Sequence, residues 1–74
     1  MIKINAKDTV YTIVTNHPRV IDILVDFGFT QIKLPQMIQT AGRLMTLKKG
    51  CDMRGFDYDQ LKEVLHNNGF EVVE

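Results

Sequence analysis

Apolar and polar residues alternate near both ends of the chain, which is typical of short half-buried strands. Ile2-Lys-Ile-Asn near the beginning shows this alternation, and Phe70-Glu-Val-Val near the end is rich in strand-forming residues. Neither segment can stand alone, because the backbone groups of a strand need hydrogen-bond partners. We therefore predict that the two termini pair as a small two-stranded ribbon.

Apolar residues at helical spacing predict two helices after the first strand. The first is capped by Asp8 or Thr9 and ends at His17-Pro18, because proline forces the residue before it out of the helical region. Pro18 then opens the second helix, where its missing N–H costs nothing, and Gly28 ends it in a left-handed conformation. The apolar faces of these two helices consist of Val10, Ile13, Val14, Val20, Ile21, Leu24, Val25 and Phe27.

Three further helices are predicted beyond a loop at Thr30–Leu34. The third begins at Pro35, and the fourth runs from its cap at Thr46 to about Met53 and ends at Gly55. The last is capped by Asp57, closes at Gly69, and buries Tyr58, Leu61, Val64 and Leu65. The third helix carries Met37, Ile38, Ala41, Leu44 and Met45.

A Gly-Phe pair follows both the second and the last predicted helix. We therefore expect both helices to end in the same way, with Phe29 packing against Leu24 and Phe70 packing against Leu65. The expected fold is mainly α. It is a compact bundle of about five short helices in a single domain, residues 1–74, with the ribbon pairing its termini.

Composition narrows the class of protein. The chain has 74 residues, 45% of them hydrophobic, and its nine basic and nine acidic side chains give zero net charge. This balance is that of a soluble globular domain and does not favour nucleic acid as a partner. No apolar run approaches the roughly 20 residues that span a bilayer, and the first residues lack a secretory signal core. A single cysteine excludes an internal disulfide, so we expect a cytoplasmic protein.

The histidine, cysteine and aspartate residues do not match the spacing of a known catalytic or metal-binding motif. His17 and His66 have no metal-ligand spacing with each other or with Cys51, so no metal, cofactor or catalytic residue is expected. We expect Cys51 to be a small buried apolar residue, with a thiolate activated by neighbouring lysines as the alternative. Asp22 and Asp26 lie on one helix face, either as a solvated surface or as an acid–base pair.

Met37, Met45 and Met53 recur every eight residues, and charge is segregated around them. The methionines fill the core or form an adaptable contact surface. Residues 30–56 carry five basic residues and one acid, a net charge of +4, whereas residues 57–74 carry a net charge of −4. These segments are either two solvated faces or a basic patch for an acidic partner or a phosphate.

The order of these signals resembles the domain-of-unknown-function 1858 family, which is related to the N-terminal domain of iron–sulfur repair di-iron proteins and to redox-disulfide domains associated with hybrid-cluster proteins. The resemblance implies a small, nearly all-helical domain. The motifs that carry it are Asp8-Thr-Val, Asn16-His-Pro, Val20-Ile-Asp-Ile-Leu, Phe27-Gly-Phe, Thr46-Leu-Lys-Lys-Gly-Cys and Arg54-Gly-Phe-Asp.

Redox members of that group carry Gly-x-x-Cys-x-x-Cys-Pro after the second helix. Gly28 and Pro35 match this motif, but its two cysteine positions fall on Gln31 and Leu34. A dithiol cycle needs two nearby thiols, so the resemblance does not extend to redox chemistry. It implies only where a site would lie, namely the Thr30–Pro35 loop and the helix that follows.

We therefore expect a non-enzymatic module that binds a protein partner, either another protein or a second copy of this chain. The alternative is binding of a small anionic ligand or nucleic acid through a basic patch, and a redox or metal protein centred on Cys51 ranks last. The candidate binding residues are Gln31, Lys33, Leu34, Met37, Arg43, Lys48, Lys49 and Arg54.

Overall fold

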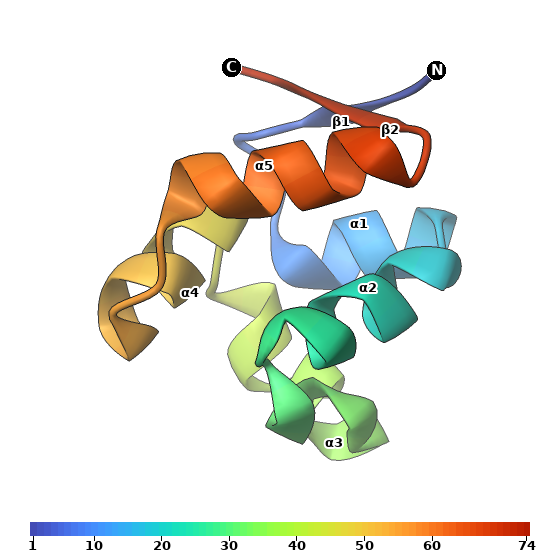
Figure 1. Cartoon of the computed structure of the whole chain (residues 1–74). Coiled ribbons are helices and arrows are strands. Elements are labelled where there is room, and N and C mark those ends of the chain that lie inside the picture. Colours follow the sequence, from blue (N-terminus) through green and yellow to red (C-terminus); the bar gives the residue numbers. More distant parts are fainter.

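The computed structural model describes all 74 residues and confirms the predicted fold class, with five α-helices beneath a sheet of the two terminal strands (Figure 1). Two short 3₁₀ helices, η1 and η2, complete the fold. The elements in chain order are β1 (Ile2–Asn5), α1 (Val10–Asn16), α2 (Arg19–Phe27), η1 (Thr30–Lys33), α3 (Pro35–Gln39), η2 (Ala41–Arg43), α4 (Leu47–Arg54), α5 (Tyr58–Asn67) and β2 (Phe70–Val73).

The two strands pair as predicted, and they run parallel, from Ile2 opposite Phe70 to Asn5 opposite Val73. All five α-helices lie between the strands in sequence and form the crossover that a parallel pair requires. Figure 1 shows the sheet lying along α5. Ile4 and Phe70 are the buried residues of the sheet, so the two ends of the chain close one side of the core.

Side-chain caps begin three of the helices as predicted. The hydroxyl of Thr9 accepts a hydrogen bond from the N–H of Thr12, and that of Thr46 accepts one from the N–H of Lys49, each over 3.2 Å. The carboxylate of Asp57 accepts a hydrogen bond from the N–H of Gln60, also at 3.2 Å. Each bond satisfies one N–H that the helix leaves without an internal partner, which sets where α1, α4 and α5 start.

The prediction of one continuous third helix from Pro35 to Met45 is wrong. The α-helix ends at Gln39, and Ala41–Arg43 forms a separate 3₁₀ turn. The break lies at Thr40, whose φ −106° and ψ −82° leave the helical region and whose hydroxyl donates a 2.7 Å hydrogen bond to the carbonyl of Gln36. Further on, Met45 is not helical, and its carbonyl accepts a 2.8 Å hydrogen bond from the N–H of Val10. Leu44, expected on the apolar face, is 81% exposed.

The predicted loop at Thr30–Leu34 is also wrong in detail, because its first four residues form η1. The N–H of Ile32 donates to the carbonyl of Phe29, which continues the turn that ends α2. Leu34 precedes a proline and is extended, with φ −80° and ψ 122°, as the steric restriction before proline requires. This residue separates η1 from α3.

A Gly-Phe pair follows α2, α4 and α5, but the shared packing expected of the second and last helices is wrong, because α2 and α4 are the two that close alike. The N–H of Phe29 donates to the carbonyl of Leu24, and the N–H of Phe56 donates to that of Cys51, each over 2.9 Å and five residues back. The rings of Phe29 and Phe56 then meet edge to face, with centroids 5.1 Å apart. Phe70 follows a turn of another type and packs edge-on against His17.

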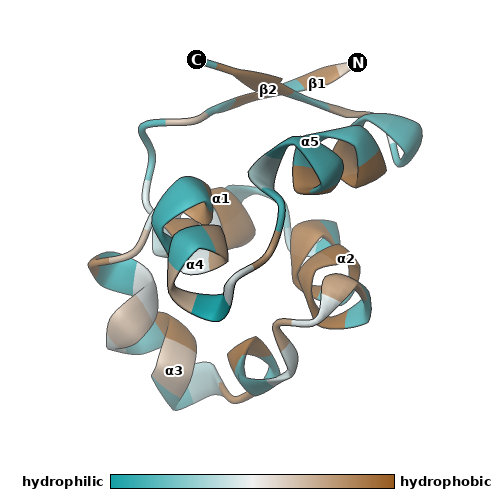
Figure 2. Cartoon of the chain, turned by 60° about the vertical axis from the view of Figure 1, so that its left-hand side comes forward, coloured by the Kyte–Doolittle hydropathy of each residue, from teal (hydrophilic) through white to brown (hydrophobic).

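The core lies between the helices and the terminal sheet. Figure 2 shows that most residues of α2 are hydrophobic, whereas α5 is hydrophilic on its upper side and hydrophobic on its lower side. The buried hydrophobic residues are Ile4, Val10, Ile13, Val14, Val20, Ile23, Leu24, Leu47, Cys51, Leu61, Leu65 and Phe70.

Gly28→Ala should cost about 3 kcal/mol of the free energy of unfolding, the sum of backbone strain and overpacking. Gly28 has φ +140°, and a Cβ there would lie 2.9 Å from Cζ of Phe56. Gly55→Ala is the matched control, because Gly55 has φ +71° but no heavy atom within 4 Å of the added Cβ. It should cost about 1 kcal/mol. Equal losses in urea denaturation would contradict the role assigned to the Phe56 contact.

Candidate functional site

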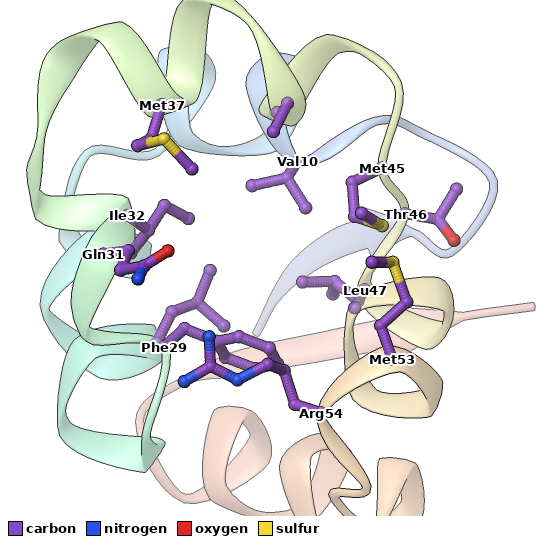
Figure 3. A pocket seen from close by; sticks show the side chains of 14 residues that line it. Val10, Phe29, Gln31, Ile32, Met37, Met45, Thr46, Leu47, Met53 and Arg54 are labelled. Carbon is purple, nitrogen blue, oxygen red and sulfur yellow. The ribbon is translucent and has the colours of Figure 1, made fainter.

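A cleft of about 220 Å³ opens between η1 and α3 on one side and α4 on the other (Figure 3). Nine of its fourteen lining residues are hydrophobic, and the polar side chains among them are Gln31, Thr46 and Arg54. The lining residues are Val10, Leu24, Phe29, Gln31, Ile32, Met37, Ala41, Gly42, Met45, Thr46, Leu47, Gly50, Met53 and Arg54.

Local structure places each wall of this cleft. The turn after α2 positions Phe29, and η1 then presents Gln31 and Ile32 beside it. The opposite wall is one face of α4, because Leu47, Gly50 and Arg54 recur at helical spacing of three and four residues. The cleft therefore depends on how the end of α2 packs against α4.

Gly50 keeps the α4 wall flat. It is buried in the helix, and a Cβ built on it would lie 3.4 Å from Cε1 of Phe29 and 3.7 Å from Cγ of Met45. These are ordinary van der Waals distances, so a methyl group would fit there. A longer side chain at this position would extend into the space between Phe29 and Met45.

The three methionines of the eight-residue repeat all line the cleft, although they come from α3, from the segment before α4, and from α4 itself. Met37 and Met45 are half-buried, whereas Met53 is 73% exposed at the rim. The two interpretations of the repeat are therefore divided among its members, since Met45 packs against the core and Met53 is on the surface. Figure 3 shows the sulfur atoms on two sides of the opening.

Arg54 supplies the positive charge of the site. Its side chain crosses the mouth of the cleft toward Gln31 (Figure 3), and its guanidinium carbon lies 5.8 Å from the centre of the Phe56 ring. Both ion pairs of the structure are made by Lys62, with Asp59 and Glu74, so Arg54 has no carboxylate partner. Its donors are free for a bound anion.

Of the eight candidate binding residues, the cleft brings together Gln31, Met37 and Arg54. Arg43 lies elsewhere, stacked on Tyr11 with its guanidinium carbon 4.1 Å from the ring centre and hydrogen-bonded to Gln39. The other four are exposed and do not line the cleft: Lys33, Leu34, Lys48 and Lys49.

Sequence reasoning missed Phe29, which precedes the candidate loop Thr30–Pro35, and did not single out Ile32 within that loop. Their signal was present, since Phe29 directly follows the glycine that ends α2 and its partner Phe56 follows the glycine that ends α4. The two Gly-Phe pairs, 27 positions apart, therefore mark the ring contact that holds Phe29, which lines the cleft, against Phe56, which does not.

Cys51 is fully buried on the inner face of α4, as expected of a small apolar cysteine. Burial, with smaller contributions from the nearby carboxylates of Asp52 and Asp57, raises the pKa of its thiol from 9.0 to about 11. The thiol is therefore protonated at neutral pH, and Lys48 and Lys49 do not activate it.

The remaining chemistry candidates do not gather into a site. Asp22 and Asp26 are exposed on α2, as a solvated face would be, and His66 is exposed in the last turn of α5. No three side chains of His, Cys, Asp or Glu lie close enough together to hold a metal ion. None of the helices combines the length and the apolar character needed to cross a membrane.

Comparison with known proteins identifies relatives of this fold. A family model described as a domain of unknown function, DUF1858, matches residues 4–62. The crystal structure of a conserved domain protein from Streptococcus pneumoniae TIGR4 is similar, with a TM-score of 0.90 and 37% sequence identity. The similarity covers 96% of this chain and 90% of that one. A search of curated proteins finds no match.

The raised pKa of Cys51 predicts that stability falls at alkaline pH. An unfolded thiol ionises near pH 9.0, whereas the folded one holds its proton to about 11, so the folded state binds more protons between these values. The free energy of unfolding should therefore decrease as pH rises from 9 to 11. Urea denaturation across this range measures the decrease.

Cys51→Ala provides the comparison for that measurement. Tyr58 titrates in the same region, because burial and its hydrogen bond to Glu74 raise the pKa of the phenol to about 12. The variant keeps Tyr58 and should lose less stability between pH 9 and 11 than the natural chain. Parallel curves would show that the thiol does not contribute.

Proposed function

The chain belongs to the family of domains of unknown function 1858, and from this premise we propose that it is a protein-interaction module whose cleft binds an apolar side chain of a partner. The observation that supports the proposal is the cleft itself, an open surface that gathers three methionines with Phe29 and Ile32. Methionine side chains adapt to the shape of what they contact, which suits a surface that receives another protein.

The size of the cleft favours a side chain over a cofactor. Sites for drug-sized molecules and cofactors measure about 300–1,000 Å³, whereas an apolar cavity of about 150 Å³ holds benzene. The 220 Å³ found here suits one large aliphatic or aromatic group. A partner would insert such a group and cover the exposed rim at Met53 with its neighbouring residues.

We propose that the module is not itself an enzyme and that it acts in the cytoplasm. The polar groups of the cleft, Gln31, Thr46 and Arg54, include no general base beside a nucleophile. With a single, buried cysteine, the chain forms no internal disulfide of the kind that small secreted domains usually have.

The alternative function, binding of a small anionic ligand or nucleic acid through a basic patch, draws less support. Lys48 and Lys49 are exposed on α4, but Arg43 already stacks on Tyr11 and donates to Gln39. Arg54, which lines the cleft, is a stronger candidate for contact with an anion than the basic patch formed by those residues.

Selection of a random twelve-residue peptide library displayed on phage against the whole chain tests the proposed function. Peptides that bind should shift the backbone amide signals of the cleft residues in NMR spectra. Met53→Ala should weaken their binding about five- to tenfold, because an apolar contact of at least 1 kcal/mol is lost at the rim.

Leu44→Ala is the matched control, since Leu44 is an exposed apolar residue that does not line the cleft. It should change binding less than twofold, and both variants should keep the melting temperature of the natural chain. Failure to enrich any peptide, or equal effects of the two variants, would refute the interaction function.

A further inference from the structure

Resting on the proposed function, we propose that the partner segment is acidic as well as apolar. One large apolar side chain of the partner fills the cleft, and a carboxylate close to it in the partner's sequence pairs with the guanidinium of Arg54. The inference names the chemistry of the partner peptide, which the apolar cleft alone does not specify.

The position of Arg54 carries this inference. The guanidinium lies at the mouth of an otherwise apolar cleft, opposite the amide of Gln31, and makes neither of the ion pairs in the structure (Figure 3). An arginine presents several N–H donors in a planar fork that matches the two oxygens of a carboxylate. A carboxylate bound there would lie beside apolar surface, where fewer water molecules compete for the same donors.

The charge of the surrounding segment has the same sign. Most of the cleft comes from residues 31–54, and residues 30–56 carry five basic side chains against the single acid Asp52. Lys33 is exposed in η1, next to the wall formed by Ile32. Arg54 at the cleft and Lys33 beside it therefore favour an acidic segment over a basic one, whereas Arg43 is engaged by Tyr11 and Gln39.

A second copy of the chain fits this site poorly, although its residues 57–74 are acidic. The large apolar side chains of that region are buried, with Leu61, Leu65 and Phe70 at most 1% exposed. The exposed large hydrophobic residue of its acidic region is Val73, at 42%, and valine is smaller than the large aliphatic or aromatic side chain proposed for the cleft. The more exposed Leu34 and Leu44 lie in the basic segment 30–56, so inserting either would bring like charges together. The complementary occupant is a separate acidic peptide segment.

The open shape of the cleft favours a peptide over a small free carboxylate. A molecule small enough to fit within 220 Å³ cannot also cover the rim, where Met53 is 73% exposed. A peptide does both, because the residues on either side of its anchor extend over the rim.

The experiment uses the same peptide selection and then tests Arg54→Gln, which keeps much of the side chain but removes its charge. Enriched peptides should carry Asp or Glu within four residues of an aliphatic or aromatic anchor. Arg54→Gln should weaken them about three- to tenfold, as loss of a charge-assisted hydrogen bond requires. Replacing the peptide's acid by its amide should weaken binding to the natural chain similarly, and to Arg54→Gln hardly at all.

Lys7→Gln is the matched control, because it removes one positive charge from an exposed residue outside the cleft. It should weaken binding less than twofold in 150 mM salt. Peptides that bind the cleft without any acidic preference would overturn this inference while leaving the proposed function intact. Failure to enrich any peptide would instead refute the proposed function.

Two further outcomes would also overturn the inference. Sodium hexanoate that shifts the cleft signals as strongly as the selected peptides, at equal concentration, would identify a small free carboxylate as the occupant. A dimer in sedimentation equilibrium that Met53→Ala dissociates would identify a second copy. We expect neither, so the natural chain should sediment as a monomer and hexanoate should bind at least tenfold more weakly.

Discussion

The close contact between the end of α2 and the turn after α4 organises this small domain. Both helices finish with a Gly-Phe pair, and the ring of Phe56 lies so near Gly28 that a Cβ there would clash at 2.9 Å. Phe27 completes the contact, with its ring centre 5.6 Å from that of Phe56. Because Phe29 is held in the same cluster, the contact that stabilises the fold also builds one wall of the cleft. Structure and candidate function therefore depend on the same few atoms.

Sequence features that determine structure within a few residues, such as helix caps, were sufficient to predict most of the fold. Hydroxyl and carboxylate caps at Thr9, Thr46 and Asp57 form as predicted, because a cap needs only an N–H three residues further on. The parallel direction of the strands and the extended segment before α4 depend on distant residues instead. The carbonyl of Met45 is held by Val10, a partner 35 positions away, and helical periodicity contains no information about such a bond.

The candidate site was partly predictable for the same reason. The predicted segment after Gly28 does contribute Gln31, and the methionine repeat does identify residues of one surface. Periodicity alone could not show that Met37 and Met53 face each other, because they lie on different helices whose packing brings them together. Arg43 and Arg54 look equivalent in the sequence. Only the fold distinguishes them, by stacking Arg43 on Tyr11 and leaving Arg54 at the mouth of the cleft.

Gly50 lowers the stability of α4 but leaves space in the cleft. A glycine inside a helix costs about 1 kcal/mol relative to alanine, and Gly50 does not have the positive φ that would require it. Nor does packing demand it, since a methyl group would meet Phe29 at an ordinary 3.4 Å. What glycine does provide is an α4 surface without a side chain between Phe29 and Met45. The helix thus gives up some stability at a position where a side chain would narrow the cleft.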